Sequence, residues 1–253
     1  MTREDIQAVL KKMARLTLPA KEAGSENFPK ATLQFLNFTG ESVVATDTHV
    51  LAVLKKYKSE PHLGRADGLP AGAPYSQSNY PDYKKVLIPK DRTDWRHVWQ
   101  SETDRYILYQ LKVFLEGVDK AARKDRTLGV PVLRLHREQD TLDRYTGCHG
   151  LAVKTRILQN LKDEKVFDGY YALPCFIKAL DLLSSAGNGG HVEMYTSKTS
   201  PRSNAGPLIT LETPDALVLI APVTRIPEDN EVRRYSERQI QRDRDGSGLD
   251  FLD

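Results

Sequence analysis

Two short stretches of the sequence bring together side chains that could catalyse a reaction or hold a metal. Asp47 and His49 are two positions apart on an expected strand, so both could lie on one face, as half of a metal site or as an acid–base pair. No third ligand follows at a suitable spacing, which favours a hydrogen-bonded structural role. Cys148 and His149 are adjacent, and neighbouring strand residues point to opposite faces. They therefore form a poor nucleophile–base pair, and Cys148 is best interpreted as a small buried side chain.

A third candidate is the glycine-rich run at residues 187–190. It follows an expected helix and precedes an expected strand, whereas a loop that cradles phosphate lies between a strand and the helix after it. The run therefore predicts a turn. Together, these patterns predict a protein that is not an enzyme and that carries no metal and no cofactor.

An eight-residue pattern occurs twice, one hundred positions apart, at residues 46–53 and 146–153. Both copies read T-x-x-H-x-L-A-V, and each follows an expected amphipathic helix. Repetition of a pattern together with its preceding elements predicts two supersecondary units that pack in the same way.

The first unit begins with an amphipathic helix over residues 5–16, because Val9, Leu10 and Met13 share one helical stripe with Ile6 and Leu16. An alternating segment at 33–38 and a strand pair at 42–47 and 49–54 follow. Residues 58–79 are rich in Pro, Gly and Ser, with little periodicity, which predicts a linker or long loop.

The second unit is expected to be complete, with the element order β-α-β-β-β-α-β-β-β. Its strongest helix spans 104–122 and turns Phe114 and Leu115 inward, and its second helix spans 173–185. The expected strands are 85–89, 130–137, 140–146, the second repeat, 191–197, 207–213 and 216–223. The sequence thus predicts an α+β fold, with helices on one face of antiparallel sheets. It divides into a reduced unit with its linker at 1–77, a complete unit at 78–226, and a charged, disordered tail at 227–253.

Composition sets the broad class. The 253 residues are 40% hydrophobic and 28% charged, which is ordinary for a globular protein of one or two domains. Two cysteines do not make a disulfide framework, which favours a reducing compartment. No apolar run approaches the roughly 18 residues of a membrane span, and the start lacks a signal-peptide core, so we expect a cytoplasmic protein without a membrane partner. After residue 225, five Arg face eight Asp and Glu, which leaves a mild basic bias on the rest.

Three segments carry a resemblance to a known family. Residues 45–52 (ATDTHVLA) resemble A-T-D-G-H-R-L-A, residues 80–87 (YPDYKKVL) resemble F-P-D-Y-R-R-V-L, and residues 217–225 (LVLIAPVTR) resemble Y-V-V-M-P-M-R-L. These motifs belong to the bacterial DNA polymerase III β subunit, the sliding clamp. They occur in the family's order, with spacing close to that of its last two domains.

The resemblance implies a ring protein with the DNA-clamp fold, in which helices line double-stranded DNA. A sliding contact needs positive charge that senses the phosphate backbone without reading bases. The candidate DNA-binding residues are the helical cations Lys11, Lys12, Arg15, Arg105, Lys112, Lys120, Arg123, Lys124 and Lys178. The alternative for any one of them is the solvated face of an ordinary amphipathic helix.

The resemblance also implies a hydrophobic groove for partner peptides, on which the three motifs converge. The groove residues carried over are Thr46, His49, Val50, Leu51, Pro81, Lys85, Val86, Ile220, Pro222, Val223 and Arg225. Val50, Val86, Ile220 and Val223 would form the apolar walls of this groove, and His49, Lys85 and Arg225 would form its rim. Departures such as Thr48 in place of glycine predict a groove for a different peptide. The alternative is that the apolar residues simply fill the junction between two units.

Two functions stay open. The first is a processivity factor of DNA replication that encircles DNA as a homo-oligomer, with three chains closing a six-domain ring, and that binds DNA polymerase or other proteins carrying clamp-binding peptides. The second is a clamp-derived adaptor or decoy that binds such peptides or the replication machinery without encircling DNA. Residues 248–253 (GLDFLD) loosely resemble the core of those peptides and could dock in a groove of this or another clamp. A solvated tail is the simpler interpretation.

Overall fold

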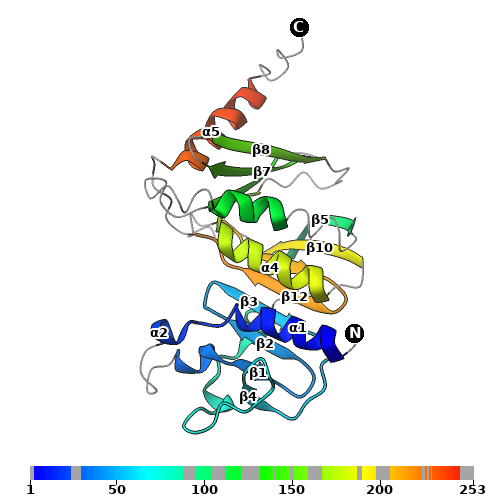
Figure 1. The fold of residues 1–253 in the computed structure, drawn as a ribbon. Coiled ribbons are helices and arrows are strands. Elements are labelled where there is room, and N and C mark those ends of the chain that lie inside the picture. Colours follow the sequence, from blue (N-terminus) through cyan, green and yellow to red (C-terminus); the bar gives the residue numbers. More distant parts are fainter. Residues whose placement is uncertain are drawn as a thin grey trace. The chain divides into compact units, whose positions relative to one another are not determined.

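The computed structural model describes residues 3–23, 30–87, 95–103, 112–120, 132–138, 141–148, 151–158, 167–186, 190–197, 206–223, 226, 228 and 230–245. They form two compact units (Figure 1). Unit 1 takes its residues from Met1–Val113, Cys175–Lys198 and Leu208–Ala221, and unit 2 from Phe114–Pro174, Thr199–Pro207 and Pro222–Asp253. The boundary expected at residue 78 falls inside unit 1, because strands from both predicted segments join one sheet.

Unit 1 is built on an eight-stranded antiparallel sheet in the order β4-β1-β2-β3-β12-β11-β10-β5. Its strands are β1 (Leu36–Phe38), β2 (Val43–Thr46), β3 (Val50–Leu54), β4 (His62–Gly64), β5 (Trp95–Thr103), β10 (Gly190–Ser197), β11 (Ile209–Glu212) and β12 (Ala216–Ile220). The strands expected near 43–54 and 191–220 are confirmed, whereas β4 and β5 were not expected. The central pair β3–β12 joins the two halves of the sequence in one sheet.

Two helices lie in front of this sheet in the view of Figure 1, α1 (Arg3–Ala14) and α4 (Leu173–Ala186). Both match the predicted helices. Val9, Leu10, Met13 and Leu16 have no exposed surface, as their shared stripe predicts. A short helix, α2 (Ala20–Ala23), follows α1.

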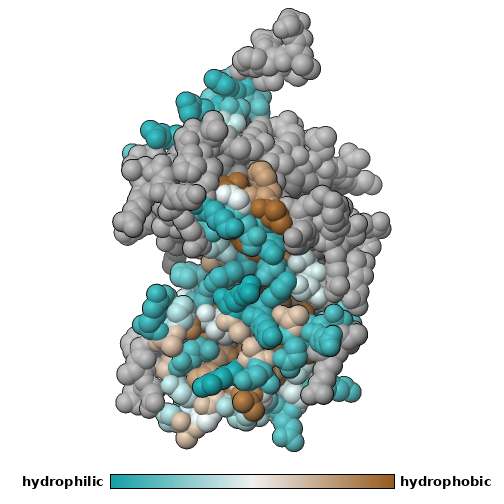
Figure 2. Space-filling model, in the orientation of Figure 1, coloured by the Kyte–Doolittle hydropathy of each residue, from teal (hydrophilic) through white to brown (hydrophobic). Residues whose placement is uncertain are grey.

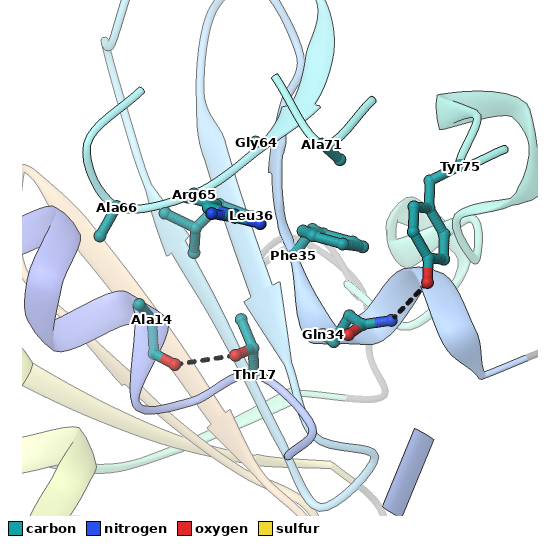
Figure 3. Close-up of a pocket in the computed structure, with 10 residues that line it drawn as sticks. All are labelled: Ala14, Thr17, Gln34, Phe35, Leu36, Gly64, Arg65, Ala66, Ala71 and Tyr75. Atoms are coloured by element: carbon teal, nitrogen blue, oxygen red, sulfur yellow. Dashed lines mark hydrogen bonds between the residues drawn. The ribbon is translucent and has the colours of Figure 1, made fainter. Parts of the chain in front are cut away.

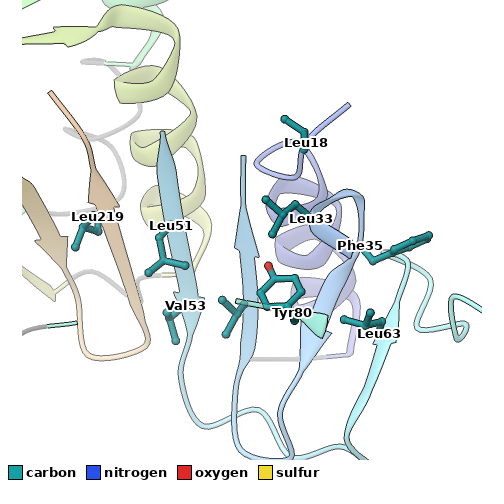
Figure 4. Packing of buried hydrophobic residues seen from close by; sticks show 9 residues of the cluster. Leu18, Leu33, Phe35, Leu51, Val53, Leu63, Tyr80 and Leu219 are labelled. Atoms are coloured by element: carbon teal, nitrogen blue, oxygen red, sulfur yellow. The ribbon is translucent and has the colours of Figure 1, made fainter. Parts of the chain in front are cut away.

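The other face of the sheet carries a cluster of buried apolar residues (Figure 4). Leu51 and Val53 of β3 and Leu219 of β12 belong to it, and the chain after β4 packs over them with Tyr75, Tyr80, Tyr83 and Leu87. The stretch expected to be a linker therefore covers a core. It includes two short 3-10 helices, Gln77–Asn79 and Tyr83–Lys85, and a third, Ala31–Gln34, precedes β1. The strand expected at 85–89 is corrected for the described residues: the Asp82 side chain accepts a hydrogen bond from the Lys84 amide at 3.2 Å and starts a helical turn instead.

Unit 2 is built on a four-stranded antiparallel sheet in the order β8-β7-β6-β9. The strands are β6 (Val132–Glu138), β7 (Thr141–Cys148), β8 (Leu151–Leu158) and β9 (Phe167–Ala172). A final helix, α5 (Glu231–Arg244), packs against β6, β7 and β8. This helix corrects the expectation of a disordered tail for residues 231–244, and residues 246–253 lie outside the described part.

The reason for α5 is visible in its sequence. Asn230 caps it, accepting a hydrogen bond from the Arg233 amide at 3.2 Å. Val232, Ser236 and Ile240, spaced four apart, are buried. Three small or apolar positions in a highly charged segment are enough for a helix that packs on one side only.

The predicted helix at 104–122 is described for residues 112–120. Leu115 is fully buried as expected, whereas Phe114 is 44% exposed and does not belong to the inward stripe. Adjacent helical residues differ by about 100° around the axis, so Phe114 lies at the side of the stripe that holds Leu115.

The two copies of the repeated pattern both form hairpins, but in different registers. In the first copy Thr46 lies opposite Leu51, and in the second Thr146 lies opposite Val153 and Cys148 opposite Leu151. The turn of the second copy thus lies one position later in the pattern, and the residue opposite its first threonine lies two positions further along, so the strands pair differently although equivalent side chains keep the same relative faces. The expectation that both copies pack in the same way is corrected.

Candidate functional site

The turn between β2 and β3 gives Asp47 a structural role. One carboxylate oxygen of Asp47 accepts hydrogen bonds from the amides of His49 and Val50, both at 2.9 Å. Thr48, between them, has a φ of 81°, which the turn requires. Asp47 therefore holds the hairpin, as the favoured structural interpretation expected. Of the Cys148–His149 pair, the structure describes only Cys148, the last residue of β7.

The predicted groove residues fall on two faces of one sheet. Val50 lies opposite Ile220, and Leu51 lies opposite Leu219, along the β3–β12 ladder. Since alternate strand residues point to opposite faces, Val50 and Ile220 point away from the cluster that holds Leu51. They are 1% and 0% exposed, so the structure places both in the core, where a bound peptide could not touch them.

The remaining groove residues are more accessible. His49, Pro81 and Lys85 are exposed, Thr46 is half-buried, and Val86 is 42% exposed. Around Val86, Tyr83 and Leu87 are partly buried and pack on the cluster of Leu51 and Leu219; the motif comparison did not single out these two residues. Pro222 and Val223 are half-buried residues of unit 2, and Arg225 lies outside the described part.

Three of the predicted DNA-binding cations converge on one carboxylate that was not predicted, Asp181 of α4. Lys12 Nζ lies 2.9 Å and Lys112 Nζ 3.1 Å from Asp181 Oδ1, and Arg15 Nη1 lies 3.6 Å from Oδ2. Burial alone would raise the pKa of Asp181, but hydrogen bonds from Lys12 and Lys112 outweigh it and hold that pKa below its ordinary value. The sequence feature that could have indicated this role is that Asp181 is the one carboxylate in α4.

The other cations differ in their surroundings. Lys11 is exposed on α1, and Lys178 of α4, 39% exposed, lies 3.9 Å from Asp47. Lys120 is exposed in unit 2. Arg105, Arg123 and Lys124 lie outside the described residues. In the view of Figure 2, which is that of Figure 1, hydrophilic residues cover α1 and α4.

Unit 2 holds a separate ion pair beneath α5, between the buried Arg134 and Asp168, whose side chain is 37% exposed. Arg134 of β6 donates to both carboxylate oxygens of Asp168, at 2.8 and 2.5 Å, and to the Ser236 hydroxyl of α5 at 2.6 Å. Its guanidinium also lies 5.0 Å from the centre of the Tyr170 ring. Arg134 therefore fastens α5 to the sheet.

A hollow of about 440 Å³ lies elsewhere in unit 1 (Figure 3). Phe35 and Tyr75, with ring centres 4.7 Å apart, form part of its wall, together with Gln34, Thr17 and Arg65. None of the predicted site residues lines it, so it is distinct from the predicted groove.

Within the described ranges, no group of three His, Cys, Asp or Glu side chains could hold a metal ion. In the same part of the chain, no helix has the length and apolar character that a membrane crossing needs.

Solved structures give the decisive comparison. DNA polymerase III subunit β from Borrelia burgdorferi matches with a TM-score of 0.57 at 16% identity, over 89% of this chain and 62% of that one. The chain has the fold of a sliding clamp. The DNA polymerase sliding clamp from Bacillus subtilis matches with a TM-score of 0.53 at 17% identity, over 87% and 63% of the two chains. The β clamp of Helicobacter pylori bound to a DNA ligase peptide matches with a TM-score of 0.51 at 17% identity, over 87% and 63%.

The clamp fold confirms the resemblance and the α+β class predicted from the three motifs. The chain spans less than two thirds of the length of the clamps it matches. No family model and no curated protein matches the sequence.

Proposed function

We propose that this protein is a non-enzymatic, clamp-like processivity factor of DNA replication that holds duplex DNA against α1 and α4. The observation that carries the proposal is the pair of neighbouring helices, bridged by Lys12 and Asp181, with Lys11, Arg15 and Lys178 on them. Exposed Lys and Arg on helices suit a contact that senses phosphates and reads no bases. Three chains would close the ring.

The same proposal includes a peptide-binding surface on unit 1, centred on Val86. Exposed apolar surface beside a rigid cluster suits the apolar anchor of a peptide, and Tyr83 and Leu87 extend that surface over Leu51. Lys84 and Lys85, both exposed, supply positive charge for an acidic neighbour of the anchor. The Helicobacter clamp with its ligase peptide is the precedent for this kind of partner.

The DNA part is tested by fluorescence anisotropy with a labelled duplex and by retention on circular against linearised plasmid. We expect the double variant Lys11→Glu/Arg15→Glu to weaken DNA binding. We expect Lys58→Glu, at an exposed lysine of unit 1 outside α1 and α4, to have a much smaller effect. A ring should also stay on circular DNA and run off linear DNA. Equal effects of the Lys11/Arg15 double variant and of Lys58→Glu, or no retention on circular plasmid, would count against the proposed DNA contact.

The alternative is a clamp-derived adaptor or decoy that binds partner peptides without encircling DNA. One observation favours it: Asp181 engages three of the candidate DNA cations. Light scattering separates the two functions. A stable assembly of three 28.5 kDa chains supports the ring, and a monomer that binds peptide but not DNA supports the adaptor.

A further inference from the structure

The ammonium group of Lys12 has no hydrogen-bond donor to spare. Its Nζ donates to Asp181 Oδ1 at 2.9 Å, to the Asp181 main-chain oxygen at 3.3 Å, and to the Ser185 hydroxyl. A lysine ammonium has three N–H groups. All three are therefore used inside unit 1, and none can bind a phosphate oxygen while these bonds last.

Asp181 is also well placed to compete with an anion from outside. Its side chain is 10% exposed, and its carboxylate is shared by Lys12, Lys112 and Arg15. One negative charge among three positive ones leaves the group with a net charge of about +2, in the arrangement that an oxyanion prefers. Arg15, whose side chain is 69% exposed and whose contact is the longest at 3.6 Å, is the cation that an incoming phosphate could reach first.

We propose that Asp181 is an internal competitor of DNA phosphate, which occupies Lys12 and Lys112 and so limits the number of phosphates that the helical face neutralises. This inference rests on the proposed DNA contact. The number of neutralised phosphates sets both the affinity for DNA and its dependence on salt. A clamp that must move along DNA needs a weak backbone contact, and an acidic residue within the basic face weakens it without removing a cation.

The first test compares Asp181→Asn with Glu60→Gln in the full chain. Both remove one negative charge from unit 1, but Glu60 is exposed and belongs to neither α1 nor α4. Binding to a labelled duplex is measured between about 50 and 200 mM salt. We expect Asp181→Asn to bind several-fold more tightly than Glu60→Gln, and its plot of log affinity against log salt to be steeper by about one to two, for one or two additional phosphates. Equal affinities and slopes of the two variants would overturn the inference.

The second test is a double-mutant cycle between Lys12 and Asp181. In the natural background, Lys12→Gln should weaken DNA binding much less than Lys11→Gln; in the Asp181→Asn background it should weaken binding several-fold. If Lys12→Gln and Lys11→Gln weaken the natural protein equally, Lys12 already binds DNA and the inference fails. If Asp181→Asn does not fold, Ser185→Ala, which frees one N–H of Lys12 and keeps every charge, must still raise the affinity.

The outcomes also separate this inference from the function on which it rests. If the natural protein binds duplex DNA and Asp181→Asn behaves like Glu60→Gln, only the role of Asp181 is rejected. If none of these proteins binds duplex DNA, the proposed DNA contact is rejected together with it.

Discussion

Leu51 lies directly opposite Leu219 across strands β3 and β12. The first residue comes from the first family-like motif and the second from the third, and Tyr80, from the second motif, packs into the same buried cluster (Figure 4). Three segments separated by as many as 168 positions in the sequence thus meet in one core. The presence of these three segments in the sequence can be explained by packing as well as by a peptide groove, because each contributes a side chain to the same apolar layer.

Leu219→Ala should therefore destabilise the protein. Leu219 is 4% exposed, and removing a buried leucine side chain costs about 2–5 kcal/mol in free energy of unfolding. Leu69→Ala is the control, because Leu69 is 60% exposed and its loss should change stability by less than about 0.5 kcal/mol. Urea unfolding followed by circular dichroism measures both, and equal midpoints would contradict the packing described here.

Val86→Asp should abolish peptide binding and leave the fold intact. Val86 is 42% exposed and is absent from the buried cluster, so a carboxylate there is tolerated by the fold but opposes an apolar or acidic peptide. A labelled peptide with the sequence of residues 246–253 is a suitable probe. We expect the affinity of the protein for this peptide to fall at least about tenfold, or by about 1.4 kcal/mol in binding free energy. Leu69→Asp adds the same charge at another exposed apolar site and should bind as the natural protein does; equal losses would place the site elsewhere.

Tyr80→Phe should stabilise the protein. The Tyr80 hydroxyl is buried and has no hydrogen-bond partner among the residues that the structure describes, and its burial raises the pKa of the phenol. Leaving a buried polar group unpaired costs about 1–3 kcal/mol, so we expect a gain of about 1 kcal/mol or more on its removal. Tyr75→Phe makes the same chemical change where the hydroxyl accepts a bond from Gln34 Nε2 at 3.3 Å, and should not stabilise. Thermal unfolding distinguishes the two, and a loss of stability in Tyr80→Phe would indicate a partner for that hydroxyl.

The elements that could be predicted from the sequence are those with a clear apolar period. Helices α1 and α4 and strands β10, β11 and β12 carry such periods and lie where they were expected. The layer over residues 70–87 could not be predicted, because single tyrosines anchor it and no period marks it. Helix α5 was missed since only one narrow side of it is buried.

The sequence predicted which segments form the candidate site better than it predicted which side chains are accessible there. Alternation along a strand indicates that Val50 and Leu51 point to opposite faces, so both could not line one groove, but it does not indicate which of them faces the core helices. The ion pair between Lys12 and Asp181 joins two helices whose residues are more than 150 positions apart in the sequence, and no local pattern predicts such a contact.

The ion pair between Arg134 and Asp168 makes the stability of the fold depend on pH. Burial alone would raise the pKa of Asp168, but hydrogen bonds and charge from Arg134 hold that pKa at about 2, below the value of about 3.9 expected in the unfolded chain. A carboxyl with a lowered pKa contributes stability that is present above its unfolded pKa and is lost as the pH falls through its folded pKa. Asp168→Asn should therefore melt at a lower temperature than the natural protein at pH 7, and this difference should shrink between about pH 4 and pH 2. Glu60→Gln should melt like the natural protein across that range, since its exposed carboxylate makes no ion pair in the described structure. A difference between Asp168→Asn and the natural protein that stayed constant down to pH 2 would show that Arg134 holds α5 without the charge of Asp168.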